Sequence, residues 1–438
     1  MTGSGSWRNW AGNQRATGVD VVHPSGADEI AAALRRAAAT GRRVRPVGSG
    51  HSFTAIARPD DVQLVLDRHA GLVDVDDAGL VTVQAGMPLH RLNVELAARG
   101  WALTNLGDID RQTVSGALST GTHGTGARFG GLATQIRALE LVLADGSRLR
   151  CSADEHPDVF AAARVGLGAL GVIDTVTLQA EPAFALRAEE RPARLGELLD
   201  GFEEFMSSTD HVEFYWFPHT DRCLTKRNTR LPPGAELEPL PRWRAVWEDE
   251  VLSNAVFAGV VAAGRRVPAL IPPLAAVSAR ALGARTWTDA SHRVFVSRRR
   301  VRFVEMEYAV PRDAAPAVLA ELHRVATAGE FRAAFPVEVR VAAADDIAPS
   351  TASGRDTAYI AAHVPARTDP GSWFAALESV AGSVGGRPHW GKLHGLDVDA
   401  LRSRYPRFDE FTALRARLDP AGVLGNAHLD RVLGPVAG

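Results

Sequence analysis

Two glycine-rich segments contain the residue types that bind phosphate groups. Residues 46–52 read PVGSGHS, and residues 115–126 read SGALSTGTHGTG. Glycine lets backbone N–H groups approach an anion closely, and small hydroxyls add hydrogen-bond donors without bulk. One such segment would indicate only a tight turn, but two in one chain favour a bound dinucleotide whose pyrophosphate lies between them.

Neither segment matches a common nucleotide-binding motif. GSGHS lacks the third glycine of the Rossmann fingerprint, and no acidic residue follows in the right context about twenty residues later. Residues 386–392 satisfy GxxxxGK, but Leu393 replaces the Ser or Thr whose hydroxyl would bind magnesium. Pro388, His389 and Trp390 would also obstruct a phosphate cradle. We therefore expect neither a Rossmann site nor an NTPase.

His51 is the one residue of the first segment that a phosphate-binding turn does not need. If a flavin ring lay over the turn, the imidazole could be the nucleophile of a covalent cofactor bond. A histidine that only hydrogen-bonds within the turn would explain the residue equally well.

Glu338 and Arg340 form the clearest pair of charges in an apolar segment. Residues 335–341 read FPVEVRV, which predicts a strand with both charges on one face and valines on the other. Charges on a largely buried sheet are costly unless they are paired or functional. The pattern indicates either a structural ion pair or a functional one.

Lysine is nearly absent from this chain. Of 49 basic residues only Lys226 and Lys392 are lysine, and the high content of alanine and glycine indicates a bias towards GC-rich codons. These two lysines are therefore candidates for positions where arginine would not serve. Chance survival on a solvated surface is the alternative for each.

The predicted elements that position these residues begin with a βαβ unit. A strand at 19–22, a helix at 28–40 with Ser25 as its N-cap and a strand at 43–47 lead into the first glycine-rich segment. Hairpins are then predicted at 73–84 and 136–152, around DDAG and DGS. The pattern predicts an α+β fold and not a doubly wound parallel sheet.

Composition divides the 438 residues into three parts. We expect an N-terminal domain over 1–182, a cap domain over 183–385 with strands at 212–217 and 301–310, and a C-terminal segment over 386–438. That last segment contains a predicted helix at 409–418 and is too short for a core of its own, so it must pack onto a larger domain.

Charge and cysteine content limit the class of protein. The net charge of −2 provides no basic face for nucleic acid, and two distant cysteines match neither a zinc motif nor a disulfide framework. No metal is expected.

The N-terminus has no secretory signal, so a cytoplasmic location is the default. Two apolar runs within 251–283 are split by Arg265 and Arg266 and are too short for a transmembrane span; we expect cap or core helices there, with membrane contact as the alternative.

The chain as a whole resembles the aldonolactone oxidoreductases within the vanillyl-alcohol-oxidase type of flavoproteins, which include gulonolactone oxidase and alditol oxidase. The resemblance runs nearly end to end. Its motifs are PVGSGHS, Asn105-Leu106-Gly107, residues 116–126, FYWFPH at 214–219, AVPRD at 309–313, FPVEVR at 335–340, GRDT at 354–357, GGRPHWGK at 385–392, Tyr405-Pro406 and LDPAGVLGN at 418–426.

This resemblance implies a PCMH-type FAD-binding domain, a cap over the flavin and a C-terminal segment that returns to the FAD domain. It makes His51 the covalent attachment site of FAD. The cofactor-binding residues that it implies are Val47, Gly48, Ser49, Gly50, His51, Ser52, Gly107, Asp108, Thr113, Gly116, Ser119, Thr120, Gly121, His123, Gly124 and Val172.

The resemblance also implies the catalytic residues Glu338, Arg340 and Lys392. Arg340 and Lys392 would hold the substrate hydroxyl and stabilise developing negative charge, while Glu338 would orient Arg340 or help to accept the proton. The expected reaction is oxidation of a hydroxyl of a sugar-derived lactone by hydride transfer to the flavin.

Two positions bear on substrate and electron acceptor. Asp108 stands where alditol oxidase has serine, so an aldonolactone is the expected substrate and an open polyol the alternative. Gly107 stands where gulonolactone oxidases have glycine and the plant dehydrogenases have alanine, which favours dioxygen as acceptor over a dehydrogenase with another acceptor. A noncatalytic sugar-binding module is the alternative from another class. The sequence gives no indication of an oligomeric state.

Overall fold

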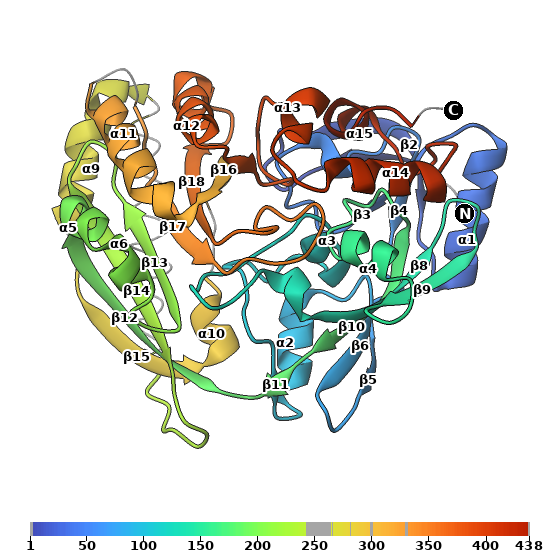
Figure 1. The fold of residues 1–438 in the computed structure, drawn as a ribbon, viewed down its shortest axis with the longest axis horizontal. Coiled ribbons are helices and arrows are strands. Elements are labelled where there is room, and N and C mark those ends of the chain that lie inside the picture. Colours follow the sequence, from blue (N-terminus) through green and yellow to red (C-terminus); the bar gives the residue numbers. More distant parts are fainter. Residues whose placement is uncertain are drawn as a thin grey trace.

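The computed structural model describes residues 3–241, 264, 266–280, 282–297, 301–328 and 332–436. Figure 1 shows two halves side by side, an N-terminal half in blue and teal and a large sheet with its helices in green to orange. The red C-terminal helices lie over the N-terminal half. This arrangement confirms the predicted α+β architecture.

The N-terminal half begins with a four-stranded sheet in the order β1-β2-β4-β3. Strands β2, β4 and β3 run parallel, and helix α1 joins β2 to β3, so the predicted βαβ unit is confirmed. The elements are β1 (Gly3–Arg8), β2 (Arg15–Val22), α1 (Ala27–Ala39), β3 (Val44–Val47), η1 (Ala55–Ala57) and β4 (Val62–Val65).

The predicted cap of α1 is wrong by one residue. Gly26 occupies the N-cap position, and no side chain caps the helix. Instead the carboxylate of Glu29, in the first turn, accepts a hydrogen bond from the backbone N–H of Ser25 at 2.9 Å. This hydrogen bond ties the first turn to the residue that precedes the N-cap, and it places a carboxylate near the positive end of the helix.

The second sheet of this half is antiparallel, with the order β5-β6-β10-β8-β9. Both predicted hairpins are confirmed as β5–β6 and β8–β9. The elements are β5 (Leu72–Val75), β6 (Leu80–Gln84), α2 (Leu89–Ala97), β7 (Trp101–Ala102), α3 (Val114–Ser119), η2 (Leu132–Gln135), β8 (Ile136–Val142), β9 (Arg148–Ser152), α4 (Pro157–Ala163), β10 (Val172–Gln179) and β11 (Glu181–Pro182), the last paired with β7.

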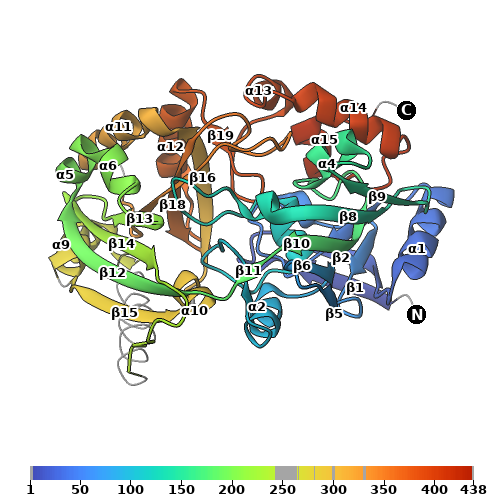
Figure 2. The same cartoon turned by 60° about the horizontal axis from the view of Figure 1, so that its bottom comes forward.

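An eight-stranded sheet forms the other half, in the order β15-β12-β14-β13-β17-β18-β16-β19 (Figure 2). The strands predicted at 212–217 and 301–310 are confirmed as β13 and β16. Its elements are β12 (Ala185–Arg194), α5 (Leu195–Asp200), α6 (Phe202–Met206), β13 (His211–Trp216), β14 (Arg222–Arg230), η4 (Pro268–Leu270), α9 (Ile271–Arg280), β15 (Arg285–Ala290), α10 (Ser291–Phe295), β16 (Phe303–Pro311), η5 (Arg312–Ala314), α11 (Ala315–Thr327), β17 (Val337–Ala342), β18 (Thr357–Pro365), α12 (Gly371–Ser383) and β19 (Arg387–Pro388).

The two faces of this sheet differ in chemistry because side chains alternate along each strand. Val337, Val339 and Val341 of β17 enter an apolar core with residues of α5, α6, α11 and α12. Glu338 and Arg340 therefore lie on the opposite face, and both are buried as well. The sheet thus has one apolar face under helices and one face that carries charges.

The C-terminal segment first completes the large sheet and then returns to the N-terminal half. β19 pairs with β16, so residues just after 386 belong to the edge of the sheet. Helices α13 (Val398–Arg402), α14 (Phe408–Leu418) and α15 (Ala427–Leu433) follow, and residues such as Phe411 and Leu429 share one core with Ile30 and Val83. The helix predicted at 409–418 is confirmed as α14, whereas the three-part division of the chain remains a prediction.

The apolar runs within 251–283 are only partly covered by the structure. Residues 251–263 lie outside the described part, while Ile271–Arg280 form α9. No helix among the described residues combines the length and apolar character needed to cross a membrane.

Candidate active site

The charged face of the large sheet meets the N-terminal half at a cavity of about 80 Å³. All three predicted catalytic residues line this substrate cavity. The complete lining is His51, Ser52, Gly107, Asp108, Ile109, Gln112, Thr120, Thr122, His123, Phe303, Glu305, Glu307, Glu338, Arg340, His363, His389, Gly391 and Lys392.

Arg340 is surrounded by three carboxylates. Its Nε donates to Glu213 at 2.9 Å, its Nη2 lies 2.6 Å from Asp108, and Nη2 also donates to Glu338. Burial disfavours the charged guanidinium, but Asp108, Glu338 and Glu213 outweigh burial and raise the pKa of Arg340 well above its usual value. The guanidinium is therefore a fixed positive charge at the cavity wall.

Strand β13 supplies two members of this group that the sequence analysis did not identify. Glu213 is almost fully buried, and the hydroxyl of Tyr215 donates to Glu338 at 2.8 Å and lies 3.3 Å from a carboxylate oxygen of Glu213. Their spacing in HVEFYW follows the same alternation as Glu338 and Arg340, so an acid inside an apolar strand was the available signal.

Lys392 enters the cavity from the C-terminal segment. Its ammonium pairs with Glu305 and lies 3.9 Å from Glu307, two residues apart on β16. Burial disfavours ionisation of Glu305, but Lys392 and His363 outweigh burial and lower the pKa of Glu305 to about 2. The two carboxylates in turn overcome burial and raise the pKa of Lys392, so the ammonium stays charged.

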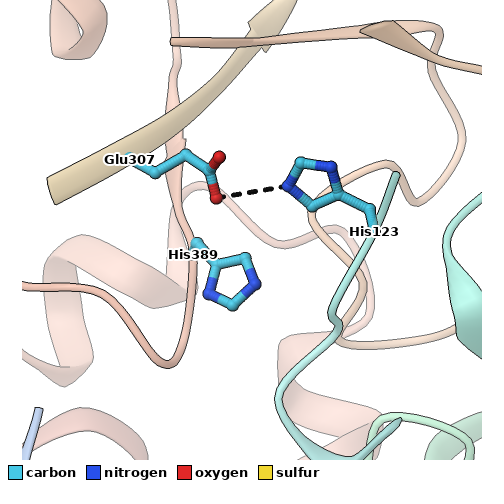
Figure 3. Close-up of side chains that lie close together, drawn as sticks. All are labelled: His123, Glu307 and His389. Atoms are coloured by element: carbon cyan, nitrogen blue, oxygen red, sulfur yellow. Dashed lines mark hydrogen bonds and ion pairs between the residues drawn. The ribbon is translucent and has the colours of Figure 1, made fainter. Parts of the chain in front are cut away.

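Figure 3 shows the carboxylate of Glu307 with the ring of His123 beside it and the ring of His389 below it. The Nε2 atom of His123 lies 3.2 Å from the Glu307 carboxylate, and the backbone N–H of Gly391 donates to Nδ1 of His389 at 3.0 Å. Burial lowers the pKa of His389 to about 4. His389 is therefore neutral near pH 7, with its proton on Nε2, the nitrogen that Gly391 leaves free.

Three groups of acids and histidines in the described chain are compact enough to hold a metal ion, namely His123/Glu307/His389, Glu305/Glu338/His363 and Asp108/Glu213/Glu338. In the last group the guanidinium of Arg340 already contacts all three carboxylates. In the second group Lys392 pairs with Glu305. In the first group the neutral ring of His389 accepts a hydrogen bond at Nδ1 and carries its proton on Nε2, so it has no free lone pair with which to bind a metal beside Glu307. The positive charges of Arg340 and Lys392 therefore already balance carboxylates that could otherwise bind a metal ion.

A larger cavity of about 330 Å³ lies in the N-terminal half and adjoins the substrate cavity through His51, Ser52, Gln112 and Thr120. Its lining is mostly glycine backbone, small hydroxyls and aliphatic side chains, together with Arg45, Asp67 and Arg91. The lining residues include Val47, Gly48, Ser49, Gly50, Thr113, Gly116, Ser119, Leu167, Gly168, Gly171, Val172 and Ile173. A Cβ on Gly48 would lie 2.5 Å from Oγ1 of Thr113, so the two glycine-rich segments approach each other as closely as glycine permits.

These residues fit FAD, with a phosphate-binding part beside a site for the ring. His51 is mostly buried, its ring stacks on Trp10 at 5.8 Å, and its Nδ1 is buried without a hydrogen-bond partner in the described chain. Burial lowers the pKa of His51, so the imidazole is held neutral and nucleophilic. The residue is thus available for a bond that the turn itself does not use.

Two of the expected cofactor-binding residues line neither cavity. Gly121 has a positive φ of 76° in the turn after α3. A Cβ on Gly124 would lie 2.3 Å from both Oδ1 of Asn105 and the carbonyl oxygen of Leu106. Gly124 therefore permits the close approach of two chain segments, while Gly107, Asp108 and His123 line the substrate cavity.

Comparison with known proteins defines the class and the family. The FAD-binding domain profile matches residues 20–152, and the profile described as D-arabinono-1,4-lactone oxidase matches residues 176–432. Cholesterol oxidase from B. sterolicum superposes with a TM-score of 0.84 at 19% identity, over 99% of this chain and 97% of that one. The fold is therefore that of the two-domain FAD-dependent oxidases.

Sequence relatives place the chain more closely. It is 41% identical to L-gulono-1,4-lactone dehydrogenase of Mycobacterium tuberculosis, over 98% of this chain and 99% of that protein. It is 33% identical to L-gulonolactone oxidase of Bos taurus, over 97% and 98%. The chain belongs to the family of aldonolactone oxidoreductases.

Proposed function

We propose that this protein oxidises a hydroxyl group of an aldonolactone of the L-gulono-1,4-lactone or D-arabinono-1,4-lactone type. The observation that carries the proposal is the position of Arg340 and Lys392 on one cavity that adjoins the cavity expected to hold FAD. FAD, when bound, supplies the acceptor for the hydride that leaves the carbinol carbon.

The charges of the substrate cavity favour a neutral polyhydroxylated substrate. Asp108, Glu305, Glu307 and Glu338 line the cavity, against only two fixed cations, Arg340 and Lys392. An aldonate, the hydrolysed form of the lactone, would bring a further negative charge to this wall. A lactone offers hydroxyl groups that can donate to the carboxylates and accept from the cations.

Each charged residue then has a separate role in the proposed reaction. Arg340 and Lys392 donate hydrogen bonds to the oxygen that becomes a carbonyl, and they stabilise its developing negative charge as its proton leaves. Their positions are preset, because each is held by buried carboxylates before substrate arrives. Glu338 orients Arg340, is itself held by Tyr215, and accepts the proton that the substrate hydroxyl loses in the proposed reaction.

The FAD of the proposed enzyme is attached covalently to His51. The support is the buried, unpartnered Nδ1 atom and the place of His51 in the lining of both cavities. The substrate cavity and the covalent bond would thus share one residue.

We propose dioxygen as the electron acceptor, with hydrogen peroxide as the second product. The support is Gly107, which lines the substrate cavity without a side chain, and the family members named oxidases. The relative named dehydrogenase favours another acceptor as the second candidate.

Anaerobic reduction by a panel of substrates tests this function directly. Purified protein with FAD bound is mixed with aldonolactones, the corresponding aldonates and alditols, and the loss of flavin absorbance is followed. We expect rapid bleaching by a lactone and little by its aldonate. Bleaching by alditols alone would make the protein a polyol oxidase, and no bleaching by any of them would indicate a sugar-binding module.

Oxygen consumption and peroxide formation then distinguish the two acceptors. The lactone that bleaches the flavin fastest is supplied in air, with and without an artificial dye. Turnover with dye but without peroxide would identify a dehydrogenase.

A further inference from the structure

Five charged residues of alternating sign form a row across five neighbouring strands. Arg285 lies across from Glu190, Glu190 from Lys226, and Lys226 from Glu213. The next strand continues the register, since Phe214 pairs with Val339 and the preceding Glu213 thus faces Arg340. This charge row leads from the edge strand β15 to the wall of the substrate cavity.

Direct contacts join two parts of the charge row, Arg285 with Glu190 and Lys226 with Glu213 and Arg340. Arg285 donates to both oxygens of Glu190, with Nη2 to Oε1 at 2.9 Å. The ammonium of Lys226 lies 3.3 Å from Oε1 of Glu213, and the other oxygen of Glu213 accepts from Nε of Arg340 at 2.9 Å. Glu213 therefore bridges Lys226 and Arg340.

Lys226 is unusual because it is a buried lysine, only 9% exposed. Burial disfavours its charge, but Glu213, Asp108 and Glu190 outweigh burial and raise its pKa, so the ammonium stays protonated. It also donates to the carbonyl of Val294 at 3.3 Å, which fixes its position from α10. Lys226 is thus linked through Glu213 to the guanidinium of Arg340 at the wall of the substrate cavity.

We propose that Lys226 is a positioning residue for the oxidation reaction: through Glu213 it holds the guanidinium of Arg340 at the substrate cavity. Lys226 does not line that cavity, so it acts only through its neighbours. That Lys226 supports an oxidation rests on the proposed function. That Lys226 holds Arg340 in place depends only on the structure of this chain.

The physical reason is the balance of charge around Arg340. Three carboxylates, Asp108, Glu213 and Glu338, compete for one guanidinium. Lys226 balances the negative charge of Glu213. Glu213 can then accept the hydrogen bond from Nε of Arg340 without pulling the guanidinium away from Glu338. Without Lys226 the strongest unbalanced negative charge lies on the Glu213 side, and Arg340 moves towards it.

Kinetics of Lys226→Met test the assignment. We expect the rate of flavin reduction to fall by about 10²-fold, as small misplacements of a catalytic group do, with kcat and kcat/KM falling together. Lys226→Arg keeps the charge and should recover part of the rate. The matched control is Arg227→Met, which lies next to Lys226 on the same strand but pairs with Glu189 on the opposite face.

A second variant guards against loss of folding. Lys226→Met leaves a buried unpaired carboxylate, whereas Lys226→Met/Glu213→Gln removes both charges. The double variant should fold and bind FAD, yet still react slowly, because an amide holds Nε of Arg340 more weakly than a carboxylate. Wild-type rates in the single or the double variant would overturn the proposal.

A crystal structure of Lys226→Met, in which Glu213 keeps its charge, separates this assignment from the proposed reaction. We expect the guanidinium of Arg340 to move away from its place beside Glu338, whatever the substrate proves to be. An unmoved Arg340 would overturn the positioning role. An inactive wild-type protein would overturn only the reaction, since the displacement of Arg340 is measured without substrate.

Discussion

His123 and Glu307 join the two halves of the molecule through one short contact. The Nε2 atom of His123 lies 3.2 Å from Oε2 of Glu307, and both side chains are almost completely buried. On its other side, Nδ1 of His123 lies 2.9 Å from the carbonyl oxygen of Gly124. The ring of His123 therefore links the backbone of the second glycine-rich segment to strand β16.

Lys392→Met should slow flavin reduction by on the order of 10²-fold or more, because a preset donor to the reacting oxygen is lost. The absorption spectrum of bound flavin should hardly change. Lys392→Arg should also be slow, since the guanidinium is larger than the ammonium that fits between Glu305 and Glu307. Arg402→Met, on the exposed side of α13, is the control, and a normal rate in Lys392→Met would make the lysine structural.

Alternation along single strands was sufficient to predict part of the site. Glu338 and Arg340 were identified because two charges at i and i+2 interrupt a valine strand. The same rule applies to Glu305 and Glu307 in FVEMEY, which were not identified although the signal was present. The two lysines were identified from composition; Lys392 lines the substrate cavity, and Lys226 lies behind its wall in contact with Glu213.

Contacts between distant strands could not be predicted in the same way. Glu213 meets Arg340 only because β13 and β17 are neighbours, and 127 residues separate the two in sequence. Local patterns predict where strands lie and which faces are apolar, but not the order of eight strands in a sheet. For the same reason the sequence did not indicate that Arg387–Pro388 would complete the large sheet.

His51→Ala tests the covalent bond to FAD. In the wild-type protein, acid precipitation should leave the yellow colour in the pellet. In His51→Ala the colour should move to the supernatant, because the neutral imidazole that forms the bond is gone. His69→Ala, a buried histidine that pairs with Asp174 and lines neither cavity, is the control and should stay yellow in the pellet. Free flavin from unmutated protein would exclude the bond.

Gly107→Ala tests the route of oxygen. A Cβ at this position would lie 3.1 Å from both the carbonyl oxygen of His123 and Cγ2 of Thr122, so the wall must move by a few tenths of an ångström. Reoxidation by dioxygen in stopped flow should slow, while anaerobic reduction by lactone stays nearly intact. Gly196→Ala, where a Cβ meets open space, is the control. Equal slowing of both half-reactions would mean a general disturbance of the cavity.

Acid should destabilise the attachment of the C-terminal segment through two buried histidines. Burial and the nearby Arg431 lower the pKa of His394 to about 3, and burial beside His394 lowers the pKa of His428 to about 3. In the unfolded chain both rings titrate near their ordinary pKa of about 6.5. Between these values the unfolded state binds more protons than the folded state, so stability is complete above about pH 6.5 and falls as the pH drops.

The double variant His394→Leu/His428→Leu should therefore lose less stability in acid than the wild-type protein. Each histidine contributes at most about 1.4 kcal/mol per pH unit to the slope in that window. Urea unfolding of the FAD-loaded proteins at pH 7 and pH 5 measures the difference. His23→Leu is the control, because His23 lies at the surface with its side chain 40% exposed. An equal loss of unfolding free energy in the double variant and the wild type would show that these two histidines take up protons in the folded state.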